Sequence, residues 1–140
     1  MQNGRVVELG LDDVGLTGAL PAEVGRLTAL RKLFIGDNLL TSVPAEIGQL
    51  TSLKWLNLDS NQLRSVPAEI GQLRSLELLY LNGNQLASVP EEIGQLTSLS
   101  RLLLNDNQLT SLPAAIRDLR AAGCYVELDD DVTVDEHFPA

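Results

Sequence analysis

Leucine recurs along the chain at equal intervals, as at Leu27, Leu50, Leu73, Leu96 and Leu119, and the polar positions between the leucines recur with it. The stretch NQLRSVPAEIGQLRSL, which begins at Asn61, returns almost unchanged from Asn84 as NQLASVPEEIGQLTSL. Each period reads L-x-x-L-x-x-L-x-[IL]-x-x-N-x-L-x-x-[VL]-P-x-x-I, in four consecutive copies. A fixed period of this length predicts a solenoid, in which each repeat buries its apolar side chains only against its neighbours.

Two short patterns within each repeat predict two elements. Apolar residues such as Leu56 and Leu58 alternate with other residues, and this period of two predicts a short strand with both leucines pointing inward. The stretch VPAEIGQL predicts a short helical return, because Pro67 suits the first turn of a helix and Glu69 lies near its positive end. Gly71 is expected to end this helix after one or two turns.

An asparagine follows each predicted strand, at Asn38, Asn61, Asn84 and Asn107. A buried asparagine must satisfy its amide donors and its oxygen acceptor, so these side chains are expected to bond backbone groups. Because one asparagine stands at the same place in every repeat, we expect a ladder in which each amide bonds the loop of the next coil.

The first repeat departs from the period. Alignment of Val6, Leu9, Leu11 and Leu16 with the following repeat requires a spacing one residue longer than the regular interval. Val14 occupies the place of the ladder asparagine. These departures predict a capping repeat, since no earlier coil is there to receive a side-chain amide.

The carboxyl end also needs one extra residue, near Gly123. Without it Glu127 would take a core position, where an unpaired carboxylate is costly. With it, Val126 and Leu128 point inward and Asp131 takes the asparagine position. We therefore predict one domain over residues 1–131, with an acidic tail at 132–140. Its parts are a capping repeat at 5–26, full repeats at 27–49, 50–72, 73–95 and 96–118, and a capping strand at 119–131.

These leucines, asparagines and prolines resemble those of leucine-rich repeat proteins, over the range from Arg5 to Asp131. The twenty-three-residue form with LPxxIGxL is similar to the Ras-group repeats of Roco proteins and of intracellular Ras-binding scaffolds, whereas LTGALP in the first repeat resembles the plant type. The resemblance implies an α/β fold: a right-handed leucine-rich repeat solenoid with a curved parallel β-sheet on its concave side and short helices on its convex side. It also implies signalling proteins such as small GTPases as partners, but no residue here selects them.

Composition narrows the class of function. The net charge of −9 repels phosphate backbones and anionic lipids, so we expect neither nucleic acid nor membrane as a partner. The apolar runs are far shorter than the about 20 residues of a membrane-spanning helix, and the amino terminus shows no signal-peptide pattern. The single cysteine, Cys124, cannot form an internal disulfide, so we expect a cytoplasmic protein, with a secreted protein stripped of its signal as the alternative.

The strand positions that face solvent on the concave side carry most of the aromatic residues. In each strand one such position comes before the central inward residue and one comes after it. The positions before it hold Glu8, Lys32, Trp55, Leu78, Arg101 and Tyr125. The positions after it hold Gly10, Phe34, Asn57, Tyr80, Leu103 and Glu127. Because Leu and Ile already fill the inward positions, the large side chains are expected to form an apolar patch open to water. Such patches mark contact surfaces, and Trp and Tyr dominate binding hot spots. The alternative is that strands simply favour aromatic residues on a partly shielded face.

A mostly acidic column follows the strands, at Asp12, Asp13, Asp37, Asp59, Asp106, Asp129 and Asp130. Beside an apolar patch it would favour a partner that carries Lys or Arg. The alternative is a solvated face that keeps a leucine-rich protein soluble. Calcium binding by Asp129, Asp130 and Asp131 is a third interpretation, but their spacing does not match that of a calcium loop, so we predict no metal site.

The sequence predicts no catalytic residues and no cofactor. The only histidine, His137, lies in the tail, and Cys124 is expected to be a packed thiol. We therefore expect a non-enzymatic protein-recognition module with an unidentified protein partner. The expected contact residues are Phe34, Trp55, Leu78, Tyr80, Leu103, Lys32, Asn57, Arg101, Asp37, Asp59, Asp106 and Tyr125. Homodimerisation through the same patch and a purely structural repeat scaffold are the alternatives.

Overall fold

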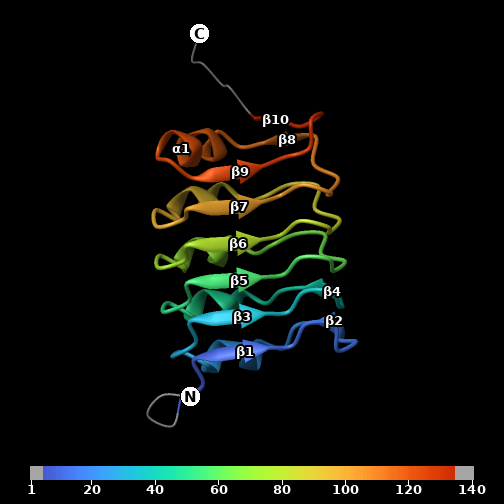
Figure 1. The fold of residues 1–140 in the computed structure, drawn as a ribbon, viewed down its shortest axis with the longest axis vertical. Coiled ribbons are helices and arrows are strands. Elements are labelled where there is room, and N and C mark those ends of the chain that lie inside the picture. Colours follow the sequence, from blue (N-terminus) through green and yellow to red (C-terminus); the bar gives the residue numbers. More distant parts are fainter. Residues whose placement is uncertain (1–4, 135–140) are drawn as a thin grey trace.

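Six short parallel strands, one from each coil, form the main sheet of this computed structural model, which describes residues 5–134 (Figure 1). They are β1 (Glu8–Gly10), β3 (Lys32–Phe34), β5 (Trp55–Asn57), β6 (Leu78–Tyr80), β7 (Arg101–Leu103) and β9 (Tyr125–Glu127). Their order in the sheet is their order in the chain, so each coil pairs only with the coils before and after it. The predicted α/β solenoid is confirmed, with this sheet on its concave side.

Short helices return the chain behind the sheet (Figure 1). Four are 3₁₀ helices: η1 (Ala22–Arg26), η2 (Ala45–Gln49), η3 (Ala68–Gln72) and η4 (Glu91–Gln95). The last return is an α-helix, α1 (Ala115–Ala121). Proline precedes each 3₁₀ helix in an extended conformation, as at Pro67 with φ of −70°, so it lies at the N-cap, one residue earlier than predicted.

Two small parallel sheets lie where the chain leaves the main sheet. One pairs β2 (Thr17–Ala19) with β4 (Leu39–Ser42), and the other pairs β8 (Ser111–Leu112) with β10 (Thr133–Val134). The second pair corrects the prediction of an acidic tail from Val132, because the chain still pairs with the preceding coil as far as Val134. Residues 135–140, including His137, lie outside the described part of the chain.

The core is a column of leucines and isoleucines that runs through the coils. Leu33, Leu56, Leu79 and Leu102, at the centres of four successive strands, are each 0% exposed. Full burial of one such side chain contributes about 1.5–3 kcal/mol. Because no coil could achieve this burial alone, the stack supplies the stability of every strand.

The glycines of the returns do not end the helices, contrary to the prediction. Gly71 does not end η3, since Gln72 still belongs to that helix, and its φ is not positive. A Cβ atom on Gly71 would instead lie 2.5 Å from the backbone oxygen of Glu92 in the next coil. Glycine at this position therefore lets successive returns stack closely.

The last return lacks that glycine. Arg117 takes the place in this return that Gly94 takes in the one before it. Here the return is α1, an α-helix of 7 residues, instead of a 3₁₀ helix of 5. Within the described chain no further return stacks on α1, so a long side chain fits there.

The asparagine ladder is present, but it points in the opposite direction. Asn61 Oδ1 accepts a hydrogen bond of 3.0 Å from the amide of Leu40, and its Nδ2 donates to the carbonyl of Ile35 at 2.9 Å. Both partners lie in the preceding coil. This agrees with the argument for the capping repeat, which needed an earlier coil to receive the amide, and contradicts the expectation that the ladder bonds the next coil. The main chain already bonds the next coil, since the amide of Ser60 donates to the carbonyl of Asn82 at 2.9 Å.

Both predicted insertions are confirmed by the strand register. Glu8 pairs with Lys32, and Arg101 pairs with Tyr125, so each terminal coil is offset by one residue more than the coils between them. Gly123 has a φ of 103°, a conformation that only glycine adopts readily, which explains why the extra residue falls there. Val126 is buried, as predicted.

The other predictions for the two ends have mixed outcomes. Leu128 is half-buried against the core, and Asp131 is exposed. Val14, in the asparagine position of the first coil, is exposed, and its amide donates to Asn38 Oδ1 at 3.2 Å. No helix within residues 5–134 is long and apolar enough to span a membrane.

Candidate functional site

The large rings of the sheet alternate away from the core, as predicted. Trp55 and Tyr80 flank the buried Leu56 and Leu79 in β5 and β6 and lie on the solvent side of the sheet. We call Phe34, Trp55, Leu78, Tyr80 and Leu103 the concave patch. The strand register places Leu78 beside Trp55, and Tyr80 beside Leu103, so the patch is continuous across four strands.

The rings of the concave patch pack against one another edge to face. The centroids of Phe34 and Trp55 are 5.0 Å apart with an interplanar angle of 82°, and those of Trp55 and Tyr80 are 5.9 Å apart at 72°. Edge-to-face pairs of this kind contribute about 0.5–1.5 kcal/mol beyond the burial of their area. All five side chains of the patch are half-buried as a result, so it is less open to water than predicted.

Trp55 also carries a polar group that no described residue satisfies. Its indole Nε1 is shielded from water and has no acceptor within hydrogen-bonding distance. A buried tryptophan N–H usually finds a partner, because an unsatisfied buried donor costs about 1–3 kcal/mol. Spacing along the chain could not indicate this, since it depends on how the neighbouring rings close over the indole.

One polar residue lies beside the concave patch and another lies within it. Lys32 is exposed and pairs with Trp55 in the strand register. Asn57 is half-buried between Phe34 and Tyr80 in that register, and its Oδ1 accepts a hydrogen bond of 3.1 Å from the amide of Asp59.

Tyr125 belongs to a separate cluster. Arg101 lies over its ring, with 5.4 Å from the guanidinium carbon to the ring centroid. The Tyr125 hydroxyl donates to the carboxylate of Glu127, and this hydrogen bond raises the pKa of the tyrosine. The side chain is 52% exposed. Tyr125 and Arg101 therefore form a cation–π pair at the last strand and do not extend the row of rings.

The acidic column consists of two neighbouring positions of the repeat, and the residues at these two positions have different structural roles. At one position Asp13, Asp37 and Asp106 have φ between 53° and 56°, a left-handed conformation that aspartate and asparagine tolerate better than most residues. In the other, Asp12 Oδ1 accepts a hydrogen bond of 2.6 Å from the amide of Gly36. Asp129 likewise accepts one of 3.0 Å from the amide of Asp106. Turn geometry therefore explains part of the column without any partner.

Asp59 is the acidic residue most perturbed by its surroundings. Burial raises its pKa, and the neighbouring carboxylates of Asp37 and Asp12 raise it further. The residue at position 36 is glycine, and a Cβ atom there would collide with the Asp59 carboxylate. Asp59 thus fills a space that the preceding coil leaves open, at the edge of the concave patch.

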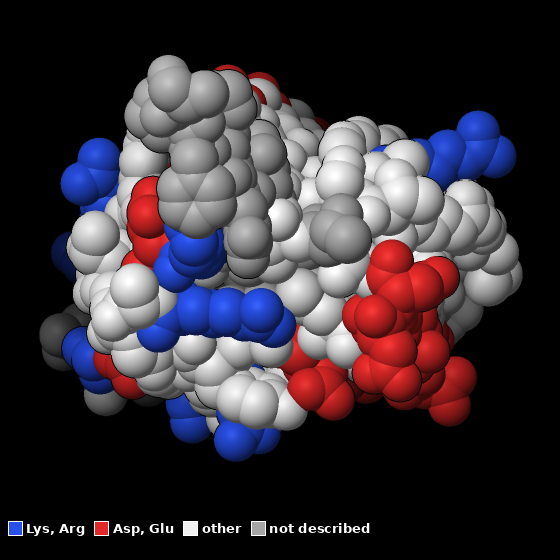
Figure 2. Space-filling model, turned by 90° about the horizontal axis from the view of Figure 1, so that it is seen from above, with Lys and Arg blue, Asp and Glu red and all other residues white. Residues whose placement is uncertain are grey.

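Charge is segregated across the molecule. Seen from the carboxyl-terminal end, acidic side chains form one patch on the side toward which the strands point, and most of the visible Lys and Arg lie on the opposite side (Figure 2). A surface ion pair, Lys54 with Glu77 at 3.7 Å, is largely exposed, and such pairs contribute little to stability. The sheet face therefore has an acidic margin beyond the strand ends (Figure 2).

The described residues contain no group of three or more His, Cys, Asp or Glu side chains placed to hold a metal ion. Cys124 is buried, and burial raises the pKa of its thiol, which disfavours the reactive thiolate. Its Sγ donates weakly to the carbonyl of Tyr125 at 3.6 Å.

One exposed apolar residue was missed by the sequence analysis. Leu39 is 49% exposed and precedes the core residue Leu40. Its position is held by Gln62, Gln85 and Gln108 in the later repeats, so a comparison of the repeats with one another could have found it. Together with the exposed Val14, it places apolar surface on the amino-terminal coils.

The four middle coils each have one strand, one asparagine rung and one short helical return, and such a stack defines a solenoid of the repeat-protein class. Family profiles match twice: a leucine-rich repeat region over residues 45–122, and a leucine rich repeat over residues 5–63. The chain belongs to the leucine-rich repeat family. The assignment to the Ras-group subtype stays a prediction.

Solved structures of this fold come from plants and bacteria. The ectodomain of the receptor kinase SOBIR1 from Arabidopsis thaliana aligns with a TM-score of 0.78 and 24% identity, over 93% of this chain and 72% of that one. A leucine-rich repeat protein of Leptospira interrogans aligns with a TM-score of 0.66 and 35% identity, over 86% of this chain and 36% of that one.

A third structure of this fold is a complex. The plant peptide hormone receptor RGFR1, in complex with RGF2, aligns with a TM-score of 0.77 and 35% identity. The match covers 86% of this chain and 20% of the receptor. No match was found among curated proteins by sequence comparison.

Proposed function

We propose that this chain is a non-enzymatic recognition module that binds a segment of a partner protein on its concave sheet face. The observation that carries the proposal is the edge-to-face row of Phe34, Trp55 and Tyr80 on the solvent side of a sheet whose core positions are already filled. The frame of the repeats is nearly constant while these positions vary from coil to coil. Other exposed positions also vary, such as Thr41, Arg64, Ala87 and Thr110, but the sheet face combines this variation with large aromatic side chains.

The chemistry of the face describes the partner. An apolar side chain of the partner would lie against the rings, and the half-buried Leu78 and Leu103 would enlarge that contact. The acidic margin beyond the strand ends, with Asp37, Asp59 and Asp106, would receive Lys or Arg, which favours a basic segment and raises the association rate. Support comes from RGFR1, a peptide hormone receptor of the same fold whose structure is a complex with RGF2.

A peptide-display experiment tests the proposal even though the partner is not identified. Random peptides displayed on phage are selected on the wild-type chain, and the selected peptides are then titrated in solution. Trp55 is the only tryptophan in the sequence, so its fluorescence reports directly on contact with the concave patch. We expect the selected peptides to combine an aromatic or aliphatic residue with Lys or Arg, and to change the Trp55 emission.

Two variants separate binding from folding. Trp55→Ala is expected to weaken peptide binding by about 2 kcal/mol or more, roughly thirtyfold, while the coils remain folded. Arg74→Ala, at an exposed position after η3, is the control and should bind like the wild type. If Trp55→Ala is folded and binds the selected peptides with wild-type affinity, the concave patch is not the binding surface.

The alternative function, homodimerisation through the concave patch, predicts a different result. The wild-type chain would then self-associate at micromolar concentration, its Trp55 emission would change with protein concentration, and Trp55→Ala would be monomeric. Cytoplasmic location remains a prediction from cysteine usage and from the lack of a signal-peptide pattern in the sequence.

A further inference from the structure

Two side-chain oxygens next to the concave patch have no hydrogen-bond donor. Oδ1 of Asn82 and Oδ1 of Asn105 are shielded from water, and no described residue donates to either. These residues hold the same repeat position in successive coils, and the Gly83 amide donates to the Asn105 carbonyl at 3.0 Å, so the two lie side by side. Because buried polar atoms are nearly always paired, the two oxygens indicate a contact that the chain alone does not supply.

The end coils satisfy this position from within the chain. Asp12 Oδ1 accepts a hydrogen bond of 2.6 Å from the Gly36 amide, and Asp129 accepts one of 3.0 Å from the Asp106 amide. The amide of Gly83, which corresponds to that of Asp106 one coil earlier, instead donates to a backbone carbonyl. The two asparagine oxygens of the middle coils are therefore left for a donor from outside.

The apolar surface of the concave patch leads directly to the two oxygens. Tyr80 and Leu103 pair in the strand register, and Asn82 and Asn105 each follow two residues later. Leu81, between Tyr80 and Asn82, is 0% exposed, so the side chains still alternate between the two sides of the sheet here. Asn82 therefore lies on the same side as Tyr80, and Asn105 on the same side as Leu103.

Carboxylates lie on both sides of the asparagine pair. Asp59 holds the same repeat position in the preceding coil, where the Ser60 amide donates to the Asn82 carbonyl at 2.9 Å. On the other side, Asn105 Nδ2 donates to Asp106 Oδ2 at 3.2 Å. Negative charge at both ends of the pair favours a positively charged donor over a neutral one.

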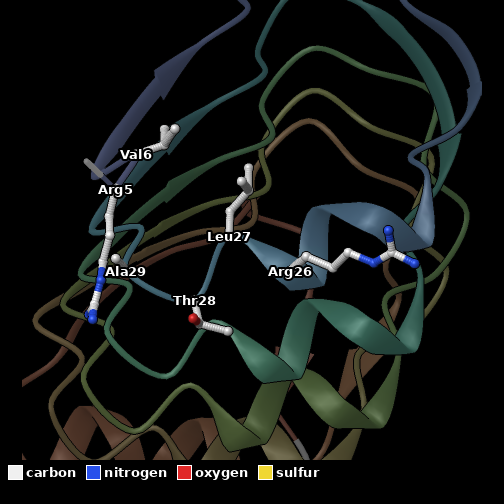
Figure 3. A pocket seen from close by; sticks show the side chains of 6 residues that line it. All are labelled: Arg5, Val6, Arg26, Leu27, Thr28 and Ala29. Atoms are coloured by element: carbon white, nitrogen blue, oxygen red, sulfur yellow. The ribbon is translucent and has the colours of Figure 1, made fainter. Parts of the chain in front are cut away.

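Two hollows elsewhere on the described chain lack this combination. The hollow at the amino-terminal end is lined by Arg5, Val6, Arg26, Leu27, Thr28 and Ala29, and its two arginines extend in different directions (Figure 3). Their charge repels a cation. The hollow between η4 and α1 is lined in part by Glu91 and Asp118, which are both exposed and thus solvated by water. Neither hollow has a shielded, unpaired side-chain atom among the described residues.

We propose that Asn82 and Asn105 form a subsite for a Lys or Arg side chain of the bound segment, an inference that rests on the proposed function. The aliphatic stem of that side chain lies on Tyr80 and Leu103, and its charged head donates to both Oδ1 atoms. Two residues of a strand span about 6.6 Å, which is within reach of such a stem. Asn82 and Asn105 are half-buried, and turning each amide toward the head group breaks no hydrogen bond of its Oδ1, which makes none.

The subsite selects for charge and for hydrogen-bond donors together. The ammonium group of Lys has three donors and the guanidinium group of Arg has five, enough for both amide oxygens and a neighbouring carboxylate. Norleucine has a comparable stem but no donor, so it would cover the two oxygens and leave them unpaired. Loss of a partner by buried polar groups discriminates strongly between ligands. The carboxylates thus attract the cation, and the two amides recognise it.

Heteronuclear NMR of the isotope-labelled chain tests the subsite without any selected peptide. N-acetyl-lysine methylamide and N-acetyl-arginine methylamide, each titrated to about 50 mM at constant ionic strength, should shift the side-chain amide resonances of Asn82 and Asn105. The norleucine analogue should leave these resonances unchanged. Resonances that stay unchanged with all three compounds, or shifts centred on Glu91 and Asp118, would contradict the proposal.

A double-mutant cycle tests the same contact with the peptides selected on the wild-type chain. Replacement of the peptide's Lys or Arg by norleucine should weaken binding to the wild type at least about tenfold. On Asn82→Leu/Asn105→Leu, which keeps the side-chain size and removes both acceptors, the two peptides should differ by less than about threefold. Asn82→Ala/Asn105→Ala takes the place of this variant if it does not fold. Gln62→Leu, which removes an exposed amide from the preceding coil, is the matched control and should keep the preference of the wild type.

The outcomes separate the subsite from the proposed function. Selected peptides without Lys or Arg, or an undiminished preference in Asn82→Leu/Asn105→Leu, would overturn the subsite, even where loss of binding in Trp55→Ala supports the concave patch. Wild-type affinity in Trp55→Ala would instead refute the proposed function. A preference that disappears in Asp59→Asn/Asp106→Asn and persists in Asn82→Leu/Asn105→Leu would assign the cation to the carboxylates and refute the subsite.

Discussion

Replacement of Asn61 by Ala is expected to destabilise the fold strongly, because Asn61 is 7% exposed and satisfies buried backbone groups. Its Oδ1 is the acceptor for the amide of Leu40 at 3.0 Å. The carbonyl of Leu58 would keep a partner, since Asn84 Nδ2 also donates to it at 3.0 Å. One orphaned buried amide costs about 1–3 kcal/mol, and each lost bond to a carbonyl that keeps a partner about 0.5–1.5 kcal/mol. With two such bonds lost, one for each amide hydrogen, we expect a total of about 2–6 kcal/mol.

Asn107→Ala provides the matched comparison. Asn107 makes the same bonds, to the amide of Leu86 at 3.0 Å and to the carbonyl of Leu81 at 3.0 Å. It is half-buried, however, so water can replace the lost amide. The expected cost is therefore only about 1–2 kcal/mol. Asn57→Ala, which removes an amide on the sheet face, controls for loss of an asparagine outside the ladder.

Urea denaturation of the three variants, followed by far-UV circular dichroism at constant pH, measures these differences in the free energy of unfolding. The reasoning requires that Asn61→Ala lose clearly more stability than Asn107→Ala. Equal losses would mean that exclusion of water does not set the value of a ladder asparagine. A loss at Asn57 as large as that at Asn61 would mean that the ladder bonds are not the cause.

Three other results are expected from the same structure. Leu56→Ala should lower the free energy of unfolding by about 2–5 kcal/mol, measured by urea denaturation, because Leu56 is 0% exposed and the cavity cannot collapse between two coils. Gly48→Ala should lower the melting temperature, since its Cβ would lie 2.8 Å from the backbone oxygen of Glu69, whereas Gly10→Ala, with open space, should not. Asp59→Asn should be more stable than the wild type at pH 7. The folded-state pKa of Asp59 is raised, so ionisation of its carboxyl group opposes folding once the pH exceeds the ordinary pKa of 3.8. The gain in stability should therefore vanish below that pH. A gain that persists at pH 2 to 3, by roughly the same amount, would show that the carboxylate charge is not its source.

The repeat frame could be predicted from the sequence because every coil meets the same two neighbours. In every repeat, one alternating stretch predicts a strand and one asparagine predicts a rung of the ladder. The extra residue near Gly123 could also be predicted, because without it Glu127 would lie in the core. The direction of the ladder could not be read in this way, since a side-chain amide can bond either neighbour. The close stacking that requires glycine at position 71 could not be predicted either, because the atom that excludes a Cβ there belongs to the next coil.

The sequence alone determined the period, the inward leucines and the face that carries Phe34, Trp55 and Tyr80, because these follow from spacing along one strand. Only the tertiary structure decided how far each ring is covered, which carboxylates serve the turns, and that Arg120 caps the outer edge of β9. These properties depend on contacts between coils, and the end coils each lack one neighbour among the described residues. What a coil exposes is therefore set by its position in the stack as much as by its own residues.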